Sequence, residues 1–332
     1  MWPKVRRLEV LMCCKIGANL TATPYVIYNF GHDAIDSSTI AFKKWLWSQK
    51  PNVFWRMPTA FGPCPGPRLD SWGRLRDGQA ERKNETATIM FRTSKTYLES
   101  LLPNGQWRFK STGTIGFASI IITTLDNMSW LGGGGYTHCG LYIHDVEYVK
   151  KDGTTVYGTY LPVLFENLTD PIISGRDELG WNKVFAGIQI DRSQESHHTS
   201  LSWRGTKFLD VKLDGLQTAV PKFEGIPADA AKDSGVLTYK YVPATGEPGR
   251  ADVEYACATS HAEEARIAQA TIHSTTWCRQ PKVEFQAGDW NSLPTLHHIT
   301  SALAAIPIYD FIFARLTVGL GVSDMTSCKR IE

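Results

Sequence analysis

The sequence lacks an excess of charge of either sign. Its 35 lysines and arginines are almost balanced by 33 aspartates and glutamates, which leaves a formal net charge of +2. The densest basic groups, at residues 4–7 and 81–83, are short and typical of a solvated surface. Because a nucleic-acid-binding protein usually carries a concentrated basic patch, we expect neither DNA nor RNA as a partner, and no membrane surface.

The sequence also lacks a long apolar segment and any regular cysteine spacing. Residues 1–14 carry positive charge and a short apolar run, but Glu9 interrupts it, so this start is a poor signal peptide and too short to span a bilayer. The seven cysteines are an odd number without a C-x-x-C pair. Reduced thiols in an intracellular compartment fit this pattern best, and we expect a cytoplasmic protein.

Several catalytic motifs are missing. Four consecutive glycines, Gly132 to Gly135, are not followed by Gly-Lys-Ser/Thr, so neither a P-loop nor a dinucleotide fingerprint is present. This run is interpreted as a flexible turn or a flap over a substrate. There is no G-x-S-x-G elbow and no H-x-x-x-H spacing, and the adjacent histidine pairs at 197–198 and 297–298 cannot share one strand face. A hydrolase or a zinc enzyme is therefore not expected.

The composition permits a packed domain of mainly β structure. Hydrophobic residues make up 42% of the chain, and residues 1–54 show no sustained period before the turn-rich segment FGPCPGPR at 61–68. We expect an N-terminal extension of uncertain order over 1–54 and one domain over 55–332. Leu141 to Val149 alternates with the period of a half-buried strand. Further strands are expected at 86–92, 115–124, 155–164, 184–190, 235–241, 265–275 and 308–320.

Two short helices are expected among these strands. One covers 94–102, with Ser94 as its N-cap and Pro103 beyond its end, and the other covers 295–305 and is ended by Pro307. Many short strands with turn signals and few helices indicate a mainly β (α+β) fold, either a barrel or a sandwich.

The most informative segment runs from residue 166 to residue 184 and reads ENLTDPIISGRDELGWNKV. It resembles the signature of the acetoacetate decarboxylase family, in which a proline-led apolar run precedes Gly-Arg-Glu, an aromatic residue, a proline and a lysine. Here Gly175, Arg176, Asp177, Trp181 and Lys183 fill these places, while Asn182 replaces the proline. The resemblance covers roughly residues 55 to 322 and implies an acetoacetate decarboxylase-like β-barrel with a few short helices.

The resemblance implies that Lys183 is catalytic and forms an imine with a ketone. A lysine attacks a ketone only as the neutral amine, and the family is known for a lysine activated by desolvation or by a neighbouring cation. The neighbours Leu179, Trp181, Val184 and Phe185 lead us to expect that desolvation favours the neutral amine. The plain alternative is an exposed lysine at the edge of a strand. An imine needs no metal, pyridoxal phosphate or other cofactor.

The chain departs from the family where two site glutamates are expected. The first position falls in the stretch Phe117-Ala118-Ser119, and the second is His138. Histidine can move protons near neutral pH, so His138 is a candidate catalytic residue, with a hydrogen-bonded strand histidine as the alternative. Phe117 and Trp181 are expected to contact the substrate.

The arginines leave two further questions open. Arg176 is either an ion-pair partner of Asp177 or Glu178 or a ligand for a substrate carboxylate. The arginine that the family places before its first strand is replaced by Asn84, and Arg68, Arg82 or Lys83 are candidates to take over its role. Arg68 is the substrate-binding candidate among them.

The resemblance predicts a lyase that decarboxylates a β-keto acid larger than acetoacetate, a small-molecule substrate, and a homo-oligomer. The segment at 61–68 is most similar to decarboxylase-like proteins of fungal polyketide clusters, including toxin pathways, so a polyketide-derived substrate is expected. Two alternatives stay open. One is an imine-dependent aldolase, dehydratase or cyclase, and the other is a non-catalytic barrel that binds an apolar ligand.

Overall fold

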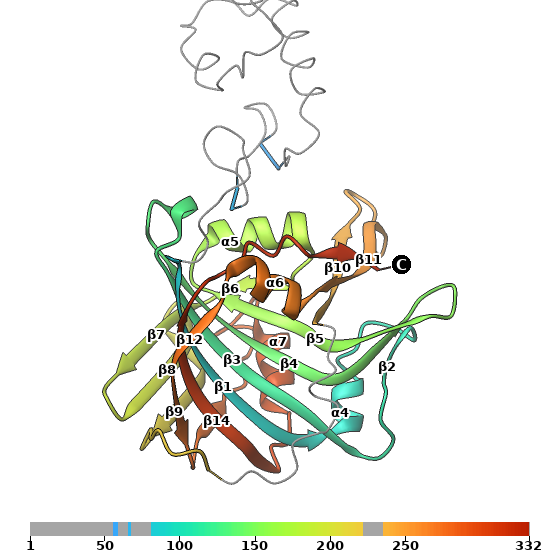
Figure 1. The fold of residues 1–332 in the computed structure, drawn as a ribbon. Coiled ribbons are helices and arrows are strands. Elements are labelled where there is room, and N and C mark those ends of the chain that lie inside the picture. The colour runs from blue at the N-terminus through green and yellow to red at the C-terminus, as the bar shows by residue number, and fades with distance from the viewer. Residues whose placement is uncertain (1–55, 59–65, 68–80, 222–234, 332) are drawn as a thin grey trace, which may run out of the picture. The chain divides into compact units, whose positions relative to one another are not determined.

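The computed structural model describes residues 56–58, 66–67, 81–221 and 235–331. The chain divides into two compact units, one made of residues 1–65 and 69–75 and the other of residues 66–68 and 76–332. All helices and strands discussed below belong to the second unit (Figure 1). The expected extension over 1–54 lies outside the described residues.

The described part of the chain is mainly β, as the sequence predicts. The strands are β1 Lys83–Ser94, β2 Trp107–Phe109, β3 Ile115–Asp126, β4 Tyr136–Val149, β5 Thr155–Glu166, β6 Lys183–Phe185, β7 Gly187–Arg192, β8 Ser196–Trp203, β9 Thr206–Asp214, β10 Val236–Pro243, β11 Ala251–Thr259, β12 Thr271–Cys278, β13 Lys282–Phe285, β14 Asp310–Leu320 and β15 Lys329–Arg330. The helical segments are α4 Lys95–Glu99, η3 Ser129–Leu131, α5 Thr169–Ser174, η4 Gly175–Leu179, α6 His261–Ala268 and α7 His297–Ala304.

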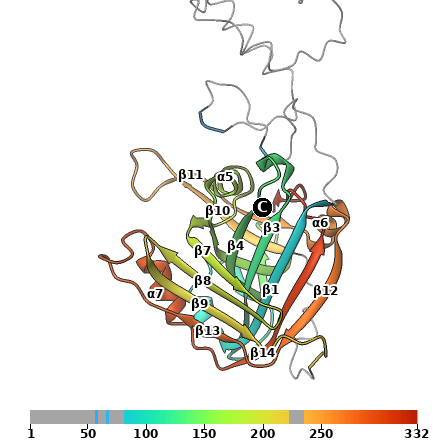
Figure 2. The same cartoon turned by 90° about the vertical axis from the view of Figure 1, so that its left-hand side faces the viewer.

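The strands form two sheets. The larger has eleven strands in the order β12-β14-β1-β3-β4-β5-β10-β11-β15, with β2 and β6 attached to β4 and β5, and the smaller has the order β13-β9-β8-β7. Figure 2 shows the small sheet as a second layer beside the large one, with α7 next to β13. The hydrogen-bonded path of the large sheet is open, so the described strands do not confirm the closed barrel that the sequence analysis expects.

The main core lies between the two sheets. It joins one face of the large sheet, with residues such as Ile89, Ile120 and Leu141, to Leu201 and Phe208 of the small sheet. The alternation of buried apolar residues along these strands makes both faces distinguishable, because successive side chains point to opposite sides. The second face of the large sheet carries a smaller apolar cluster made of Tyr142, Leu161, Leu164, Trp181 and Val236.

Most predicted elements are present with shifted ends, but two differ. The strand expected over 184–190 is divided into β6 and β7, which belong to different sheets. The helix expected after Ser94 is the short α4, and Ser94 Oγ accepts a hydrogen bond from the amide of Tyr97, as predicted. The strand expected over 265–275 is a helix in its first part, because α6 ends at Ala268 and β12 begins only at Thr271. Ser260 caps α6 by accepting from the amide of Glu263, a Ser-x-x-Glu pattern typical of a helix start.

The glycine run closes the turn between β3 and β4. Gly132 and Gly133 have positive φ angles of 65° and 87°, and a Cβ on Gly135 would lie 1.9 Å from the carbonyl oxygen of Leu125. Other residues would be strained at these positions or would collide with the backbone.

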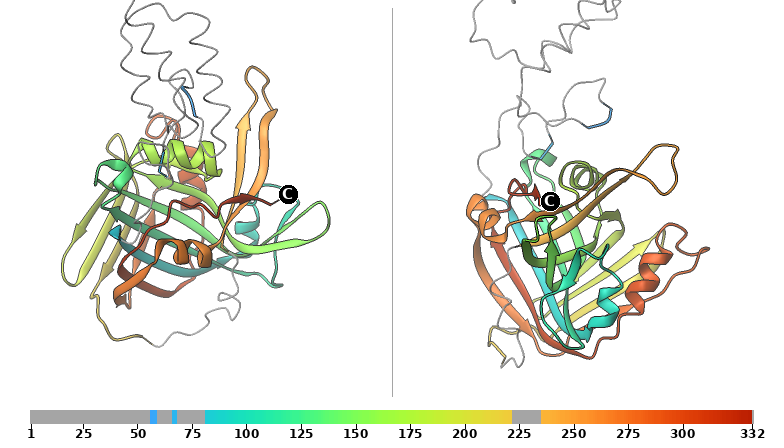
Figure 3. Two further views of the ribbon diagram at one scale, coloured as in Figure 1. Left: turned by 45° about the horizontal axis from the view of Figure 1, so that its top comes forward. Right: turned by 90° about the vertical axis from the view of Figure 1, so that its right-hand side faces the viewer.

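Figure 3 shows α6 beside β12, well away from α7. No helix in the described ranges is both long and apolar enough to cross a bilayer.

Candidate active site

The loop that carries Lys183 leaves β5 and returns to the same strand. After β5 come α5 and the π-helical turn η4, which ends at Gly180 with a φ of +71°. A Cβ at Gly180 would lie 2.7 Å from Cβ of Lys240, so both the backbone angle and the space require glycine. Strand β6 then runs parallel to β5, with Lys183 opposite Leu164.

The amine of Lys183 is buried. The residue is 8% exposed, and Nζ donates to the carbonyl oxygen of Pro171 at 3.0 Å. Nζ also lies 2.8 Å from Oε1 of Glu166 and 5.9 Å from the ring centroid of Trp181. The lysine is therefore not the exposed residue of the plain alternative. Of the residues expected to desolvate the amine, Trp181 is buried beside it, whereas Phe185 is 46% exposed.

Gly175 of the motif makes room for this lysine. A Cβ at this position would lie 2.4 Å from Cε and 2.8 Å from Nζ of Lys183. The backbone φ of Gly175 is −68°, which any residue adopts, so close approach rather than conformation requires glycine here.

Glu166 is the site residue that the sequence analysis missed. It is fully buried at the end of β5, and its Oε2 has no hydrogen-bond partner within the described ranges. Burial raises the pKa of the Glu166 carboxyl, while the charge of Lys183 opposes that rise. A buried carboxyl with a raised pKa beside a buried amine can exchange a proton with it. The residue opens the motif segment, but only the parallel pairing of β5 with β6 brings it to the lysine.

His138 lies next to this pair. It stands directly opposite Glu166 in the register of β4 and β5, so both side chains lie on the same face of the sheet. Burial, with a smaller contribution from the charge of Lys183, lowers the pKa of His138 to about 3. The imidazole is therefore neutral near neutral pH, and a catalytic role of His138 stays a prediction. A neutral imidazole can still donate or accept one hydrogen bond, and its buried Nδ1 has no partner in the described part of the chain.

Arg176 and Trp181 hold the lysine in position. Trp181 is 6% exposed, in agreement with its expected place at the site. Arg176 is exposed, and its Nη1 donates to the backbone carbonyl of Lys183 at 3.0 Å. Among the described residues it forms no ion pair with Asp177 or Glu178. This hydrogen bond holds the backbone of Lys183. It is neither the ion pair nor the contact with a substrate carboxylate that the sequence suggests for Arg176.

The remaining candidates are not gathered at Lys183. Phe117 is half-buried on β3, on the same face as Thr123, which is paired with His138. Phe117 precedes Thr123 by six residues, or about 20 Å along the strand. Arg68 lies outside the described residues. Arg82 is buried in an ion pair with Asp324 at 2.5 Å, so it is not free to bind a substrate, and Lys83 is exposed.

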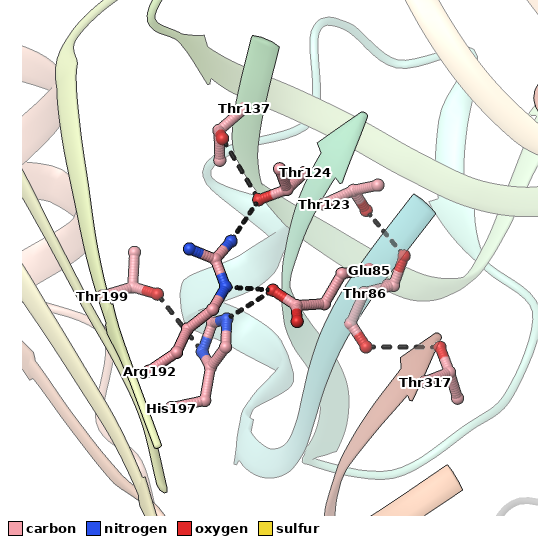
Figure 4. A network of polar contacts seen from close by, with 9 residues as sticks. All are labelled: Glu85, Thr86, Thr123, Thr124, Thr137, Arg192, His197, Thr199 and Thr317. Carbon is pink, nitrogen blue, oxygen red and sulfur yellow. Dashed lines mark hydrogen bonds and ion pairs between the residues drawn. The ribbon is translucent and has the colours of Figure 1, made fainter. Parts of the chain in front are cut away.

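A separate polar network lies on the other face of the large sheet (Figure 4). Glu85 of β1 accepts from Arg192 Nε at 2.7 Å and lies 3.3 Å from His197 Nε2. The hydrogen bond from His197 is the main cause that lowers the pKa of Glu85, and Arg192 adds to it. Arg192 also donates to Thr124. This network ties β1 and β3 of the large sheet to β7 and β8, and none of these contacts involves Lys183.

Solved structures of similar fold include acetoacetate decarboxylases. One is a structure of acetoacetate decarboxylase itself, with 14% sequence identity and a TM-score of 0.53 over 77% of this chain and 90% of that chain. Another is the acetoacetate decarboxylase of Legionella pneumophila, with 14% identity and a TM-score of 0.50 over 78% and 91%. At these identities the likeness establishes the fold alone.

A third similar structure is the enduracididine biosynthesis enzyme MppR in complex with pyruvate, with 10% identity and a TM-score of 0.52 over 76% of this chain and 90% of that chain. No curated protein sequence matches the chain significantly. The family model described as acetoacetate decarboxylase (ADC) matches residues 56–277, a range that includes Glu166, Lys183 and the whole loop between them. The chain therefore belongs to the acetoacetate decarboxylase family.

Proposed function

We propose that this protein forms an imine between Lys183 and a ketone, and that it uses this imine to decarboxylate a β-keto acid. The observation that carries the proposal is the buried amine of Lys183 at 2.8 Å from the buried carboxyl of Glu166. A surface lysine has no such partner, and two buried titratable groups in contact are typical of sites that move protons.

Glu166 supplies the base that the amine needs. Two buried opposite charges lose their hydration, which is costly, and burial raises the pKa of the Glu166 carboxyl. Transfer of the proton from Nζ to Glu166 produces a neutral amine and a neutral acid, both of which are cheaper to keep away from water. The neutral amine is the nucleophile.

The proton held by Glu166 is then used in the next step. The amine adds to the ketone carbon, and the resulting carbinolamine loses its hydroxyl as water after Glu166 donates the proton. The iminium ion accepts the electron pair of the carbon–carboxylate bond, so that carbon dioxide leaves and an enamine remains. Protonation of the enamine carbon and addition of water release a ketone one carbon shorter and regenerate the amine.

The surroundings of Lys183 suit a positively charged intermediate. The iminium nitrogen would remain near the Pro171 carbonyl, the ring of Trp181 and the carboxylate of Glu166, all of which stabilise a cation. The apolar cluster around Trp181 and Leu164 excludes water from this point and strengthens these interactions.

A second candidate keeps the imine and changes the reaction to an aldol, dehydration or cyclisation step. It is favoured by His138, which stands where family decarboxylases carry a glutamate. It is also favoured by the similar fold of MppR, which has been solved with the condensation product of pyruvate and imidazole 4-carboxaldehyde at a TM-score of 0.52. A non-catalytic ligand-binding protein is the third candidate. In such a protein the buried contact between Lys183 and Glu166 would have no functional role.

The proposal extends to the biological setting. The substrate is a small-molecule β-keto acid larger than acetoacetate and of polyketide origin, on a route to a toxin or another secondary metabolite, and the protein acts in the cytoplasm as a homo-oligomer. Support for the polyketide origin comes from the segment at 61–68, which resembles such proteins in sequence. Most of that segment lies outside the described residues.

The test is an assay of carbon dioxide from carboxyl-labelled β-keto acids of increasing chain length, with the wild type and Lys183→Met. Release by the wild type alone supports the decarboxylase. Consumption of the keto acid by the wild type without gas, through condensation with an added aldehyde, supports the second candidate. Tight binding of the acids by both proteins without turnover would replace both enzymatic readings with the ligand-binding one.

A further inference from the structure

The large sheet must curl strongly, and Lys183 lies on its concave face. Strands β11 and β12 are seven steps apart in the strand order, which is about 34 Å in a flat sheet. Only residues 260–270 join them, and eight of these form α6, so the connection reaches no more than about 26 Å. The two ends of the sheet therefore approach each other.

The segment after β14 identifies the concave face. It runs from Gly321 to β15 at the other end of the strand path, so it crosses the side toward which the sheet bends (Figure 1). Met325 and Cys328 of this segment pack against the apolar cluster that contains Leu164 and Trp181. The face that carries Lys183 and Glu166 is consequently the inner one.

Arg315 of β14 lies in the same register row as Lys183 on this inner face. Each residue of the row is paired directly with the next, and no bulge interrupts the pairing between them. Directly paired side chains point to the same side of a sheet. From β12 to β6 the row consists of Trp277, Arg315, Thr88, Ile121, Gly140, Leu164 and Lys183.

The guanidinium of Arg315 lies over aromatic rings and has no anionic partner among the described residues. Its central carbon lies 5.5 Å from the ring centroid of Phe313 and 6.0 Å from that of Trp277, and the two rings meet edge to face. Within residues 81–221 and 235–331 no carboxylate pairs with it, and its buried Nε has no hydrogen-bond partner. Burial lowers the pKa of Arg315, although arginine stays charged near neutral pH. A partly desolvated cation without an anion lowers the stability of the folded protein. Because its orientation is fixed, such a guanidinium is well suited to bind an anionic ligand.

The row between the two cations is mostly apolar. Ile121 and Leu164 contribute hydrocarbon, and Thr88 offers one hydroxyl beside Arg315. At Gly140 the place of a Cβ is filled by side-chain atoms of Leu164 and Tyr142, at 2.8 and 3.0 Å. Thr86, whose Oγ1 is 3.1 Å from that of Thr123, lies in the neighbouring row on the same face. The row thus begins at the amine of Lys183, continues through apolar residues, and ends at the hydroxyl of Thr88 and the guanidinium of Arg315.

We propose that Arg315 binds a second carboxylate of the substrate, at the end remote from Lys183, so that the preferred substrate is a β-keto diacid with an apolar chain between its ends. This inference rests on the proposed imine at Lys183 and names the substrate class for that site. The carboxylate that leaves as carbon dioxide is a different one and lies beside the imine.

The test compares wild type, Arg315→Gln and Arg330→Gln on β-keto monoacids and β-keto diacids of matched length. Arg330 is the control, because it also lies over a ring, that of Tyr255 at 4.5 Å, but on β15 outside the row. We expect Arg315→Gln to raise the KM for the diacid about tenfold to hundredfold, as for loss of a hydrogen bond to a charged group, and to leave the KM for the monoacid and both kcat values unchanged. Equal effects on monoacid and diacid, or an unchanged KM for the diacid, would overturn the assignment.

A saturated diacid without a ketone separates this inference from the proposed function. Calorimetry with this probe does not depend on Lys183 chemistry, so it decides the role of Arg315 even if no keto acid reacts. Binding by the wild type and by Lys183→Met, with loss in Arg315→Gln, supports the carboxylate site. Absence of binding to the wild type, or equal binding by Arg315→Gln, refutes it, and a thermal melt of each variant shows that the protein is folded.

Discussion

The Nζ atom of Lys183 and the Oε1 atom of Glu166 are 2.8 Å apart on adjacent parallel strands, and both side chains are buried. At this separation a proton can pass directly between the amine and the carboxylate, and burial raises the pKa of the carboxyl. The short loop of α5 and η4 brings the lysine back to the carboxyl at the end of β5.

Replacement of Glu166 by glutamine should slow imine formation while the lysine stays in place. Glutamine has a similar shape but cannot accept the proton of Nζ or return it to the carbinolamine. We expect a loss of about 10²–10⁴-fold in the rate of imine formation, the usual contribution of acid–base catalysis. Stopped-flow absorbance of the imine measures it.

Glu264→Gln is the matched control for this variant. Glu264 is also a buried carboxylate, but it accepts from the amide of Ser327 on the C-terminal segment and has no contact with Lys183. Its loss should leave the rate of imine formation unchanged. A wild-type rate in Glu166→Gln would mean that Glu166 is not the base.

Gly175→Ala should displace the lysine without unfolding the protein. The new Cβ would be 2.4 Å from Cε of Lys183, and the flexible side chain can move away, but only out of its contact with Glu166. Misplacement of a reacting group by about 1 Å can cost about 10²-fold in rate. Gly105→Ala is the control, because nothing lies within 4 Å of the place that a Cβ would take there. Equal activity of the two variants would show that the approach of Gly175 to Lys183 does not matter.

The stability of the protein should fall as the pH is lowered from neutral. Burial lowers the pKa of His138 to about 3 and that of His144 to about 4, from 6.5 in the unfolded chain. Between these values the unfolded chain binds protons that the native chain does not, so the contribution is complete above pH 6.5 and is lost as the pH falls toward the folded values. Each histidine can contribute up to about 1.4 kcal/mol per pH unit to the slope.

Urea unfolding at a series of pH values measures this slope. His138→Gln and His144→Gln should each flatten the fall in unfolding free energy between pH 6.5 and pH 4. His144→Gln also loses the contact between Nε2 and Ser119 Oγ at 2.7 Å, which lowers stability at every pH but not its slope. Two variants with the slope of the wild type would contradict the buried, neutral state of these histidines.

Arg82→Met should destabilise the protein strongly. The ion pair between Arg82 and Asp324 ties the start of β1 to the C-terminal segment, and both side chains are 2% exposed. Loss of one partner of a buried pair leaves the other charge uncompensated and typically costs about 3–5 kcal/mol. Arg250→Met, which breaks an exposed pair with Glu247, should cost less than about 1 kcal/mol. Similar melting temperatures for the two variants would show that the buried pair does not hold the segment.

The parts of the fold that depend on local patterns could be predicted. The alternation at 141–149 indicated β4, and Ser94 marked the start of α4. The strand expected at 265–275 failed because apolar and β-branched residues from Thr271 onward suggested one long strand, while the Ser260 cap before it was not recognised. The strands of the small sheet from Ser196 to Asp214 were not predicted. In β8 two of the buried positions are the polar residues His197 and Thr199, so no apolar alternation marks the strand, whereas the alternation of Leu209, Val211 and Leu213 in β9 was overlooked.

The site was predictable only where the motif names its residues. Lys183 and Trp181 follow from the motif, and the structure places them together. Glu166 required the parallel pairing of β5 with β6, and Arg315 required the register of five strand pairs, which no local pattern contains. Phe117 was assigned from the resemblance to the family, and β3 places it six residues along the strand from Thr123, the partner of His138.

The central claim is tested most directly by borohydride reduction of the purified protein in the presence of a β-keto acid, followed by mass mapping of the modified peptide. We predict one stable adduct on Lys183, lost in Lys183→Met and retained in Glu264→Gln. An unmodified Lys183 across mono- and diacids of all chain lengths, in a protein that melts cooperatively, would contradict the account.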